Sequence, residues 1–411
     1  MADVQPRTIC MFSNLYPPVY SGSSTQCSQL ARELSNRGHK VIVVTARLDR
    51  QTASYEKSDG VHVYRLPAFH LPKMRVSLNF PWLNSTFVPG NANRVKAIFD
   101  LHKPDIIHLH NHMFDLAFSA VRAARQFNRP LIITIHTLIK HPRPLYNWIL
   151  YPLDRWFLKR TVIEKADLIL CPDTTIEGYV SEAFGYVDKL LLPYGITQMP
   201  EPSQHKLESI RKKFGLENSS VILSLGHLHE IRNRKELIEI LPALLSRYPD
   251  LKLLIVGDVG TDSAALLARR LGVSDSVIFA GSIPHSDVPS YLGIADLEAH
   301  WFHGSNPQNK TLGIAALEAM GAGKVVVGTA DEDVYGKGVL KNNENVILVS
   351  LTSLEKLASR ISDLLEDDQR RAAIGSRART TIADHFSWDS VCRQTLRAYE
   401  CAIEKKLKGY Q

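Results

Sequence analysis

The sequence predicts an α/β protein made of two doubly wound domains. Buried-strand patterns alternate with one-sided helix patterns along the chain, which is typical of βαβ units and parallel sheets. The length of 411 residues exceeds the about 100–200 residues of one ordinary domain. The alternation is interrupted once, where Gln, Pro, Glu and Ser crowd into Thr197–Gln204. We therefore expect domains over residues 1–198 and 205–385, followed by a C-terminal helix within residues 386–411.

The first βαβ unit shows the pattern most clearly. Ile9–Ser13 has the composition of a buried strand, and a loop rich in Pro, Ser and Gly follows it. Apolar residues then recur at i, i+3, i+4 and i+7 from Cys27 to Leu34, which predicts a helix that Gly38 ends before a strand at Val41–Val44. Further strands are expected at Ile106–Leu109, Leu131–Ile135, Leu168–Leu170, Val221–Leu225, Leu253–Val256, Val277–Phe279, Val325–Val327 and Val346–Val349, and a last helix at Trp388–Lys408.

The composition is that of an ordinary globular protein, with 45% hydrophobic and 22% charged residues. No segment approaches the roughly 20 apolar residues that span a bilayer, and the first ten residues lack the apolar stretch of a secretory signal. Five scattered cysteines without CxxC spacing indicate buried thiols in a reducing compartment. We expect a cytoplasmic protein that is either free or peripheral on the cytoplasmic face of a membrane.

The positive charge lies in the first half of the chain. Residues 1–200 carry 23 Lys and Arg against 15 Asp and Glu, whereas residues 201–411 carry 26 against 27. The balance of +8 in the first half indicates an anionic partner there: a membrane surface, a phosphorylated acceptor or a nucleic acid. A solvated basic surface with no partner explains the same charge. Nucleic acid is disfavoured, because the basic residues are dispersed and no DNA or RNA module is visible.

Two candidate site segments follow strands of the first domain. Tyr20–Ser24 contains a Gly at a predicted helix start, where free amides and the helix dipole favour an anion; a Gly in a tight turn is the alternative. His108, His110 and His112 alternate at a strand end, and His136 ends the next strand. No carboxylate or thiol completes a metal site around them, so we expect a binding site without a metal.

Two further candidates belong to the second domain. Gly226–Lys235 places cations after a strand, which suits a diphosphate; a solvated helix start is the alternative. Thr311 is expected to be the N-cap of a helix over Leu312–Met320. Glu318 lies two turns along the same face, where it could bind ribose hydroxyls while the first amides meet phosphates.

The chain resembles glycosyltransferase family 4, whose members are retaining enzymes of the GT-B fold. The resemblance covers almost the whole chain in consistent order. It is carried by Arg37–Val41 (RGHKV), Asp105–His110 (DIIHLH), Pro193–Ile196 (PYGI, with Tyr194 where the family has Asn), Leu317–Val326 (LEAMGAGKVV) and Phe386–Trp388 (FSW). The resemblance implies two Rossmann-like domains facing across a cleft, with the C-terminal helix crossing back to the first domain.

The resemblance also implies roles for individual residues. Gly22 would offer backbone to the donor phosphate, His110 would be the active-site histidine near the donor sugar, and His136 would line the acceptor side. Glu318 would be the second Glu of the family's E-x7-E motif and bind the ribose. The amides of Thr311, Leu312 and Gly313 would meet the donor.

Three positions besides Tyr194 depart from the family pattern. Lys310 stands where the first Glu of E-x7-E meets the donor sugar, so a phosphate or a sugar carboxylate could be its partner. His227 replaces the usual diphosphate-binding Arg. Arg232 aligns with the usual diphosphate-binding Lys, and Lys235 could serve instead. We count Lys310, His110 and Glu318 as the catalytic candidates.

The resemblance implies transfer of a sugar from a UDP- or GDP-linked donor with retention, without a metal or other cofactor. Residues 141–160 mix aromatic, aliphatic and basic side chains, and Phe69–Trp82 adds a similar patch. Such segments suit a membrane interface, which favours a glycan or lipid-linked acceptor; a core helix plus loop is the alternative. The other functions left open are a sugar phosphorylase, a nucleotide-sugar epimerase and a catalytically altered binding subunit.

Overall fold

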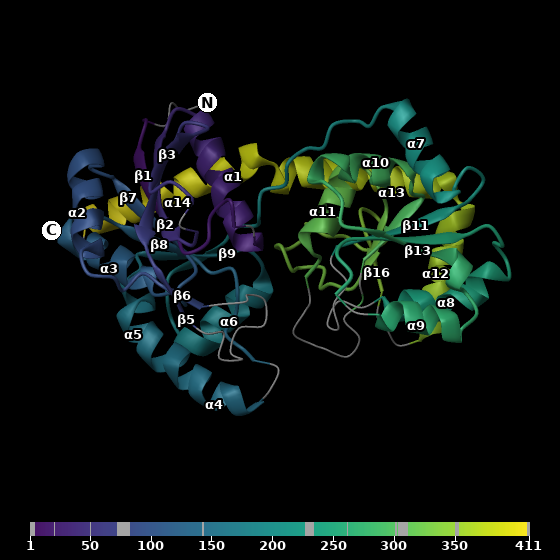
Figure 1. Cartoon of the computed structure of the whole chain (residues 1–411), viewed down its shortest axis with the longest axis horizontal. Coiled ribbons are helices and arrows are strands. Elements are labelled where there is room, and N and C mark those ends of the chain that lie inside the picture. The colour runs from purple at the N-terminus through teal and green to yellow at the C-terminus, as the bar shows by residue number, and fades with distance from the viewer. Residues whose placement is uncertain are drawn as a thin grey trace. The chain divides into compact units, whose positions relative to one another are not determined.

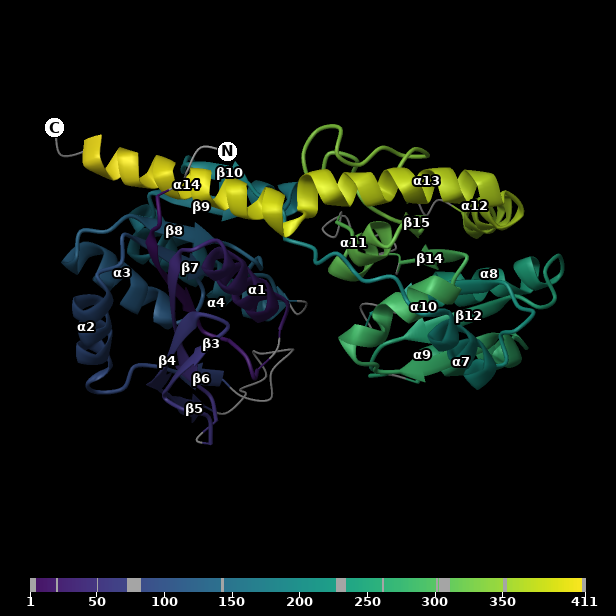
Figure 2. The same cartoon turned by 90° about the horizontal axis from the view of Figure 1, so that it is seen from above.

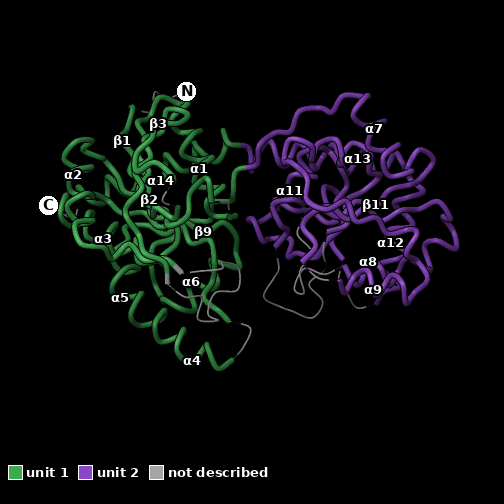
Figure 3. The backbone as a smooth tube through the Cα atoms, in the orientation of Figure 1, with its two compact units in different colours: residues 1–195, 388–411 green, residues 196–387 purple. Residues whose placement is uncertain are grey.

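The computed structural model divides the chain into two compact units (Figure 3). Unit 1 comprises Met1–Gly195 and Trp388–Gln411, and unit 2 comprises Ile196–Ser387. The structure describes residues 5–19, 21–49, 51–71, 83–141, 144–226, 234–260, 262–300, 302, 311–349 and 353–408. Within these residues no helix is long and apolar enough to cross a membrane.

Unit 1 is built on an eight-stranded sheet with the order β10-β9-β8-β7-β1-β2-β4-β3. Every pairing in it is parallel except that of β3 with β4. The strands are β1 (Thr8–Ser13), β2 (Lys40–Arg47), β3 (Tyr55–Ser58), β4 (Val61–Pro67), β7 (Ile106–His110), β8 (Leu131–Thr134), β9 (Leu168–Cys171) and β10 (Lys189–Leu191), and a separate hairpin pairs β5 (Phe69–Leu71) with β6 (Leu83–Ser85).

Helices cover both faces of this sheet (Figure 1). They are α1 (Gly22–Asn36), α2 (Asn91–His102), α3 (Leu116–Gln126), α4 (Pro144–Pro152), the π-helical η1 (Leu153–Leu158), α5 (Lys159–Thr161), the short η2 (Ile163–Lys165), α6 (Thr174–Phe184) and α14 (Trp388–Lys408).

Alternate residues of β1 show how the two faces are packed. Cys10 and Phe12 belong to a core cluster with residues of α2, α3 and α6. Ile9 and Met11 belong to another cluster with residues of α1 and α14. Because successive side chains of a strand point to opposite faces, β1 is buried on both sides, as in other parallel sheets. The C-terminal helix therefore belongs to the core of unit 1, and Figure 2 shows it extending along that unit.

Unit 2 repeats this architecture with a six-stranded parallel sheet in the order β13-β12-β11-β14-β15-β16. The strands are β11 (Val221–Leu225), β12 (Lys252–Val256), β13 (Val277–Gly281), β14 (Leu297–Ala299), β15 (Val326–Gly328) and β16 (Ile347–Leu348). The helices are α7 (Gln204–Phe214), α8 (Lys235–Leu245), α9 (Ser263–Arg270), η3 (Ser274–Ser276), η4 (His285–Asp287), α10 (Val288–Ile294), α11 (Ile314–Gly321), α12 (Leu354–Glu366), α13 (Asp368–Thr381) and η5 (Ile382–Phe386).

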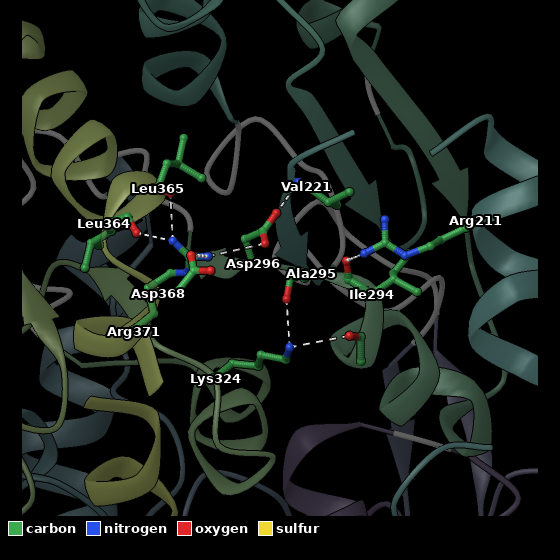
Figure 4. A network of polar contacts seen from close by, with 11 residues as sticks. Arg211, Val221, Ile294, Ala295, Asp296, Lys324, Leu364, Leu365, Asp368 and Arg371 are labelled. Carbon is green, nitrogen blue, oxygen red and sulfur yellow. Dashed lines mark hydrogen bonds and ion pairs between the residues drawn. The ribbon is translucent and has the colours of Figure 1, made fainter. Parts of the chain in front are cut away.

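A network of polar contacts fixes the start of β14 in unit 2 (Figure 4). Arg211 donates to the carbonyl of Ile294 at 3.0 Å, and the Lys324 ammonium donates to that of Ala295 at 2.7 Å. The next residue, Asp296, accepts a hydrogen bond of 2.7 Å from the first amide of β11. Burial lowers the pKa of Lys324, and the carbonyls of Ala295 and Gly293 accept hydrogen bonds from its ammonium. The network belongs to the scaffold, at the opposite end of β14 from the candidate site.

Candidate active site

The first candidate lies at the start of α1. Ser21 is its N-cap: the Ser24 amide donates to the Ser21 hydroxyl at 3.1 Å, and the Ser21 amide donates to the Ser24 hydroxyl at 2.7 Å. Gly22 is the first helical residue, and a Cβ there would meet no heavy atom within 4 Å. The capping box uses some of the terminal amides, so the remaining ones at Gly22 and Ser23 could meet an anion.

The second candidate lies at the C-terminal ends of β7 and β8, where two histidines have different surroundings. His108 uses both ring nitrogens: Nδ1 is 2.8 Å from the Tyr399 hydroxyl and Nε2 is 2.7 Å from the Thr134 hydroxyl. His110 Nδ1 lies 2.9 Å from His136 Nε2, but its own Nε2 is buried without a hydrogen-bond partner among the described residues. His108 therefore has a structural role, whereas His110 keeps one nitrogen for a ligand.

His110 is the end of a chain of three polar rings. His136 Nδ1 lies 2.9 Å from the Tyr194 hydroxyl, and the His136 ring stacks on both neighbours at interplanar angles of 13° and 14°. The His136 amide donates to the Asn111 side chain at 2.8 Å, which fixes its position further. Each bond along the chain sets the tautomer of the next ring, because a neutral imidazole carries one N–H.

Burial keeps these imidazoles neutral. It lowers the pKa of His108 and of His136 to about 3, and the pKa of His110 well below its ordinary value. A neutral His110 can donate to or accept from a sugar hydroxyl at Nε2. It is unsuited to supply a proton at neutral pH, because its imidazolium form is not populated.

His112 does not join this site, so the expectation of three histidines on one face is wrong for the third. His112 Nε2 lies 2.9 Å from Asp154 in η1, and the Tyr179 hydroxyl donates to the same carboxylate at 2.6 Å. The strand ends at His110, and Asn111 adopts a φ of 67°, which turns the chain away. Within the described residues no group of three or more His, Cys, Asp or Glu side chains could hold a metal ion.

The third candidate, α11 in unit 2, begins later than its sequence predicts. Gly313 is the N-cap, and the expected N-cap Thr311 instead donates to the carbonyl of Leu312 at 3.2 Å. Leu312 is buried in the core, and its carbonyl also accepts from the Tyr335 hydroxyl at 2.5 Å. This burial holds the chain outside helical geometry, so the first free helical amides are those of Ile314 and Ala315.

Glu318 lies on α11 with a partner that the sequence did not indicate. Its Oε1 is 2.8 Å from His285 Nε2, and the two side chains are 16% and 63% exposed. The hydrogen bond to Glu318 raises the pKa of His285. His285 begins the one-turn helix η4 after β13, with Pro284 as its N-cap, and no periodic pattern marks this position. An accessible carboxylate therefore sits one turn beyond the free amides of α11.

The cationic segment after β11 is described only at its ends. His227 and Arg232 lie outside the described residues, as does Lys310 before α11. Lys235 is the first residue of α8, and its ammonium is 3.6 Å from Glu239 with 59% of the side chain exposed. Lys235 therefore lies at a solvated helix start.

Arg234 has a role that sequence reasoning missed, because nothing local distinguishes it from its cationic neighbours. Its side chain is fully buried. Nε donates to the Ser224 hydroxyl at 2.9 Å, and one terminal nitrogen donates to the carbonyls of Leu225 and Gly226 at 3.1 and 2.8 Å. Arg234 thus fixes the end of β11 by hydrogen bonds, at the point where the cationic segment begins.

A second buried polar pair lies beside β11 in the sheet. Glu298 of β14 is fully buried, and its Oε1 is 3.0 Å from His300 Nδ1 and 3.5 Å from the Leu225 amide. Sequence reasoning missed β14 itself, because the strand has three residues with a Glu in the middle. The carboxyl end of this sheet therefore carries buried polar groups, and ligands of such sheets bind at this end.

Two family models match the chain. The model for Glycosyltransferase Family 4 matches residues 20–192, and that for Glycosyl transferases group 1 matches residues 207–381. Two doubly wound units with these matches define a glycosyltransferase of the GT-B fold. The chain belongs to glycosyltransferase family 4, within the group 1 glycosyltransferases.

The relatives among characterised proteins are moderately similar. The alpha-monoglucosyldiacylglycerol synthase of Streptococcus pneumoniae is 26% identical over 78% of this chain and 70% of its own length. The GDP-mannose-dependent alpha-(1-6)-phosphatidylinositol monomannoside mannosyltransferase of Mycolicibacterium smegmatis is 29% identical over 92% of this chain and 94% of its own. The relatives are named glycosyltransferases, and the chain is a transferase enzyme.

Solved structures share the fold at lower identity. HepE of Anabaena in complex with UDP has a TM-score of 0.71 and 18% identity, covering 96% of this chain and 99% of that one. Sucrose-phosphate synthase of Thermosynechococcus elongatus has a TM-score of 0.70 and 19% identity, covering 96% and 98%. At this identity the likeness concerns the fold alone.

Proposed function

We propose that the chain transfers a sugar from a UDP- or GDP-linked donor to a lipid-linked or membrane-proximal glycan acceptor, with retention and without a metal. The observation that carries the donor part is Glu318 on α11. Its carboxylate is accessible at the carboxyl end of a parallel sheet, one turn beyond the free amides of Ile314 and Ala315. Such a helix start suits phosphates, and a carboxylate accepts hydrogen bonds from both ribose hydroxyls.

In this proposal each candidate residue has a separate task. Glu318 holds the ribose, and the amides at the starts of α11 and α1 meet the donor phosphates. The cations of the segment before α8 and Lys310 stabilise the departing diphosphate, whose charge grows in an oxocarbenium-like transition state. His110 orients a sugar hydroxyl through Nε2, since burial holds it neutral. Protein cations then replace a metal.

The acceptor part is supported by the surface of unit 1 and by the relatives. The α4 helix buries none of its residues, which is contrary to a core helix there, whereas the following η1 buries Asp154 and Leu158. The names of two relatives contain a glycolipid, monoglucosyldiacylglycerol in one and phosphatidylinositol monomannoside in the other. Exposed aromatic and basic side chains on α4 and η1 suit a peripheral membrane contact close to such an acceptor.

The test is a transfer assay with UDP- and GDP-sugars and lipid acceptors, in which NMR reads the anomeric configuration of the product. We expect an α-linked product from an α-linked donor, at a rate that EDTA leaves unchanged. Inversion, or loss of activity on chelation, would contradict the proposal. A requirement for free phosphate would indicate a phosphorylase, and donor epimerisation without an acceptor would indicate an epimerase.

The His285→Ala variant is expected to lose a pH dependence of donor binding. Glu318 raises the pKa of His285 above its ordinary 6.5, so their pairing is complete below that value and is lost as pH rises through the raised pKa. A ribose has to displace the imidazolium from Glu318. The donor KM of the wild type should therefore fall as pH rises, while that of the variant stays flat. An equally steep KM profile in the variant would assign the dependence to another group.

The Tyr194→Phe variant is expected to lower kcat/KM by about tenfold, because it loses a half-buried hydrogen bond that positions His136 and, through it, His110. Tyr399→Phe is the matched control, since it removes a hydroxyl bonded to His108 outside this chain of rings. Steady-state kinetics and thermal unfolding of both variants measure the expected fall of kcat/KM and any change in stability. Equal kinetic losses would mean that Tyr194 contributes only to folding.

A further inference from the structure

The outer surface of unit 1 carries an apolar stripe on one helical segment. Figure 1 shows α4 and α5 at the edge of the unit, joined through η1. Trp148 is 79% exposed and Trp156 is 60% exposed. We call the set formed by Leu145, Trp148, Ile149, Leu153, Trp156 and Phe157 the apolar stripe; all six are exposed.

The stripe faces away from the unit because the other side of the segment is anchored. Asp154 is buried and pairs with His112 at 2.9 Å, and Leu158 is buried in the core of unit 1. The spacing of Leu145, Trp148 and Ile149 places them on one side of α4. An amphipathic helix normally buries its apolar side, so this inverted arrangement indicates an external partner.

A basic hollow lies next to the stripe. Its volume is about 600 Å³, and it lies between α3 and the end of the helical segment. Arg122, Arg125, Arg160 and Lys165 line it, with no acidic residue among the lining side chains. None of the four forms an ion pair within the described residues. The Arg160 guanidinium lies 5.3 Å from the Trp156 ring centroid, so the hollow and the stripe are continuous.

We propose that the basic hollow binds the phosphates of anionic phospholipids while the apolar stripe enters the bilayer interface. Tryptophan favours that depth, with its ring among acyl chains and its N–H in contact with headgroups. Four unneutralised cations repel one another until an anion enters, and an anionic bilayer supplies anions at high local density. The inference rests on the membrane part of the proposed function and gives it a site and a lipid class.

The basic charge of this surface favours an anionic bilayer as its partner over a second copy of the chain. Two basic hollows brought together would repel, so self-association through this face is disfavoured. The +8 balance of residues 1–200 adds long-range attraction toward an anionic surface.

The experiment is co-sedimentation of the full chain with vesicles of phosphatidylcholine alone or mixed with phosphatidylglycerol. We expect binding to the mixed vesicles, weakened by salt, with a blue shift of tryptophan fluorescence. The double variant Arg122→Gln/Arg125→Gln should lose about 30-fold in affinity for the mixed vesicles. The double variant Trp148→Ser/Trp156→Ser should lose binding as well as the fluorescence shift.

The matched controls change exposed side chains of unit 1 that belong to neither feature. They are Lys57→Gln/Arg397→Gln for the charge and Tyr186→Ser for the aromatic surface, and each should bind as the wild type does. Equal affinity for both vesicle types, or equal losses in the charge control and in Arg122→Gln/Arg125→Gln, would overturn the proposal.

Donor binding by the same preparations separates the two proposals. In one outcome the protein fails to bind vesicles while a nucleotide sugar still raises its melting temperature. This outcome would refute only the lipid site and leave the donor assignment intact. Vesicle binding without any change of melting temperature on addition of nucleotide sugars would refute the donor assignment and support the lipid site.

Discussion

Replacing Glu318 with alanine should abolish sugar transfer while unit 2 stays folded. The carboxylate would make hydrogen bonds to both ribose hydroxyls, and bonds to a charged group contribute about 1.5–3 kcal/mol each. Their loss corresponds to a fall in kcat/KM of about 100-fold or more. In the structure the side chain pairs only with the exposed His285 among the described residues, so folding should not depend on it. Initial rates over a range of donor concentrations measure the effect.

The control for this prediction is Glu355→Ala, which removes an exposed carboxylate from α12 and should leave transfer unchanged. Glu318→Gln should retain part of the activity, because the amide oxygen still accepts one hydrogen bond. Near-normal turnover by Glu318→Ala would refute the assignment of the ribose to this side chain.

Replacing Arg234 with methionine should lower the free energy of unfolding of the protein by about 3 kcal/mol. The methionine fills much of the space but removes this donor from the buried Ser224 hydroxyl and Leu225 carbonyl and from the half-buried Gly226 carbonyl. A buried acceptor without a partner costs about 1–3 kcal/mol, which makes this the largest stability effect expected of a single substitution here. Urea unfolding followed by circular dichroism measures it.

Arg247→Met serves as the matched control, since that guanidinium is 62% exposed and its ion pair with Glu366 lies in solvent. Exposed pairs contribute little, so the free energy of unfolding should change by less than about 0.5 kcal/mol. If Arg234→Met unfolded at the same urea concentration as the wild type, the hydrogen bonds of Arg234 at the end of β11 would not contribute to stability.

Local periodicity predicted the parts of the fold that depend on local signals. The helix from Gly22 to Asn36 and its stop near Gly38 follow from an apolar face and a glycine with a φ of 86°. The last helix, Trp388–Lys408, has the predicted bounds. Continuous apolar runs marked strands that are buried on both faces, such as β11 and β12.

Tertiary contacts explain what the sequence could not predict. Burial of Leu312 delays the start of α11 and displaces Thr311 from the N-cap. The chain of rings joins His110, His136 and Tyr194 across 26 and 58 positions, a proximity that no local pattern encodes. The resemblance gave site roles to His110 and His136, and the hydrogen bond between His136 and Tyr194 emerged only from the structure.

The proposed reaction depends on binding of a nucleotide-sugar donor at α11 of unit 2. A thermal-shift panel of UDP- and GDP-sugars on the wild type and on Glu318→Ala tests it most directly, because a ligand of the folded state raises the melting temperature. We expect a concentration-dependent rise in melting temperature with one nucleotide class for the wild type, and little or none for the variant. The same rise in both proteins, or none with any nucleotide sugar, would contradict it.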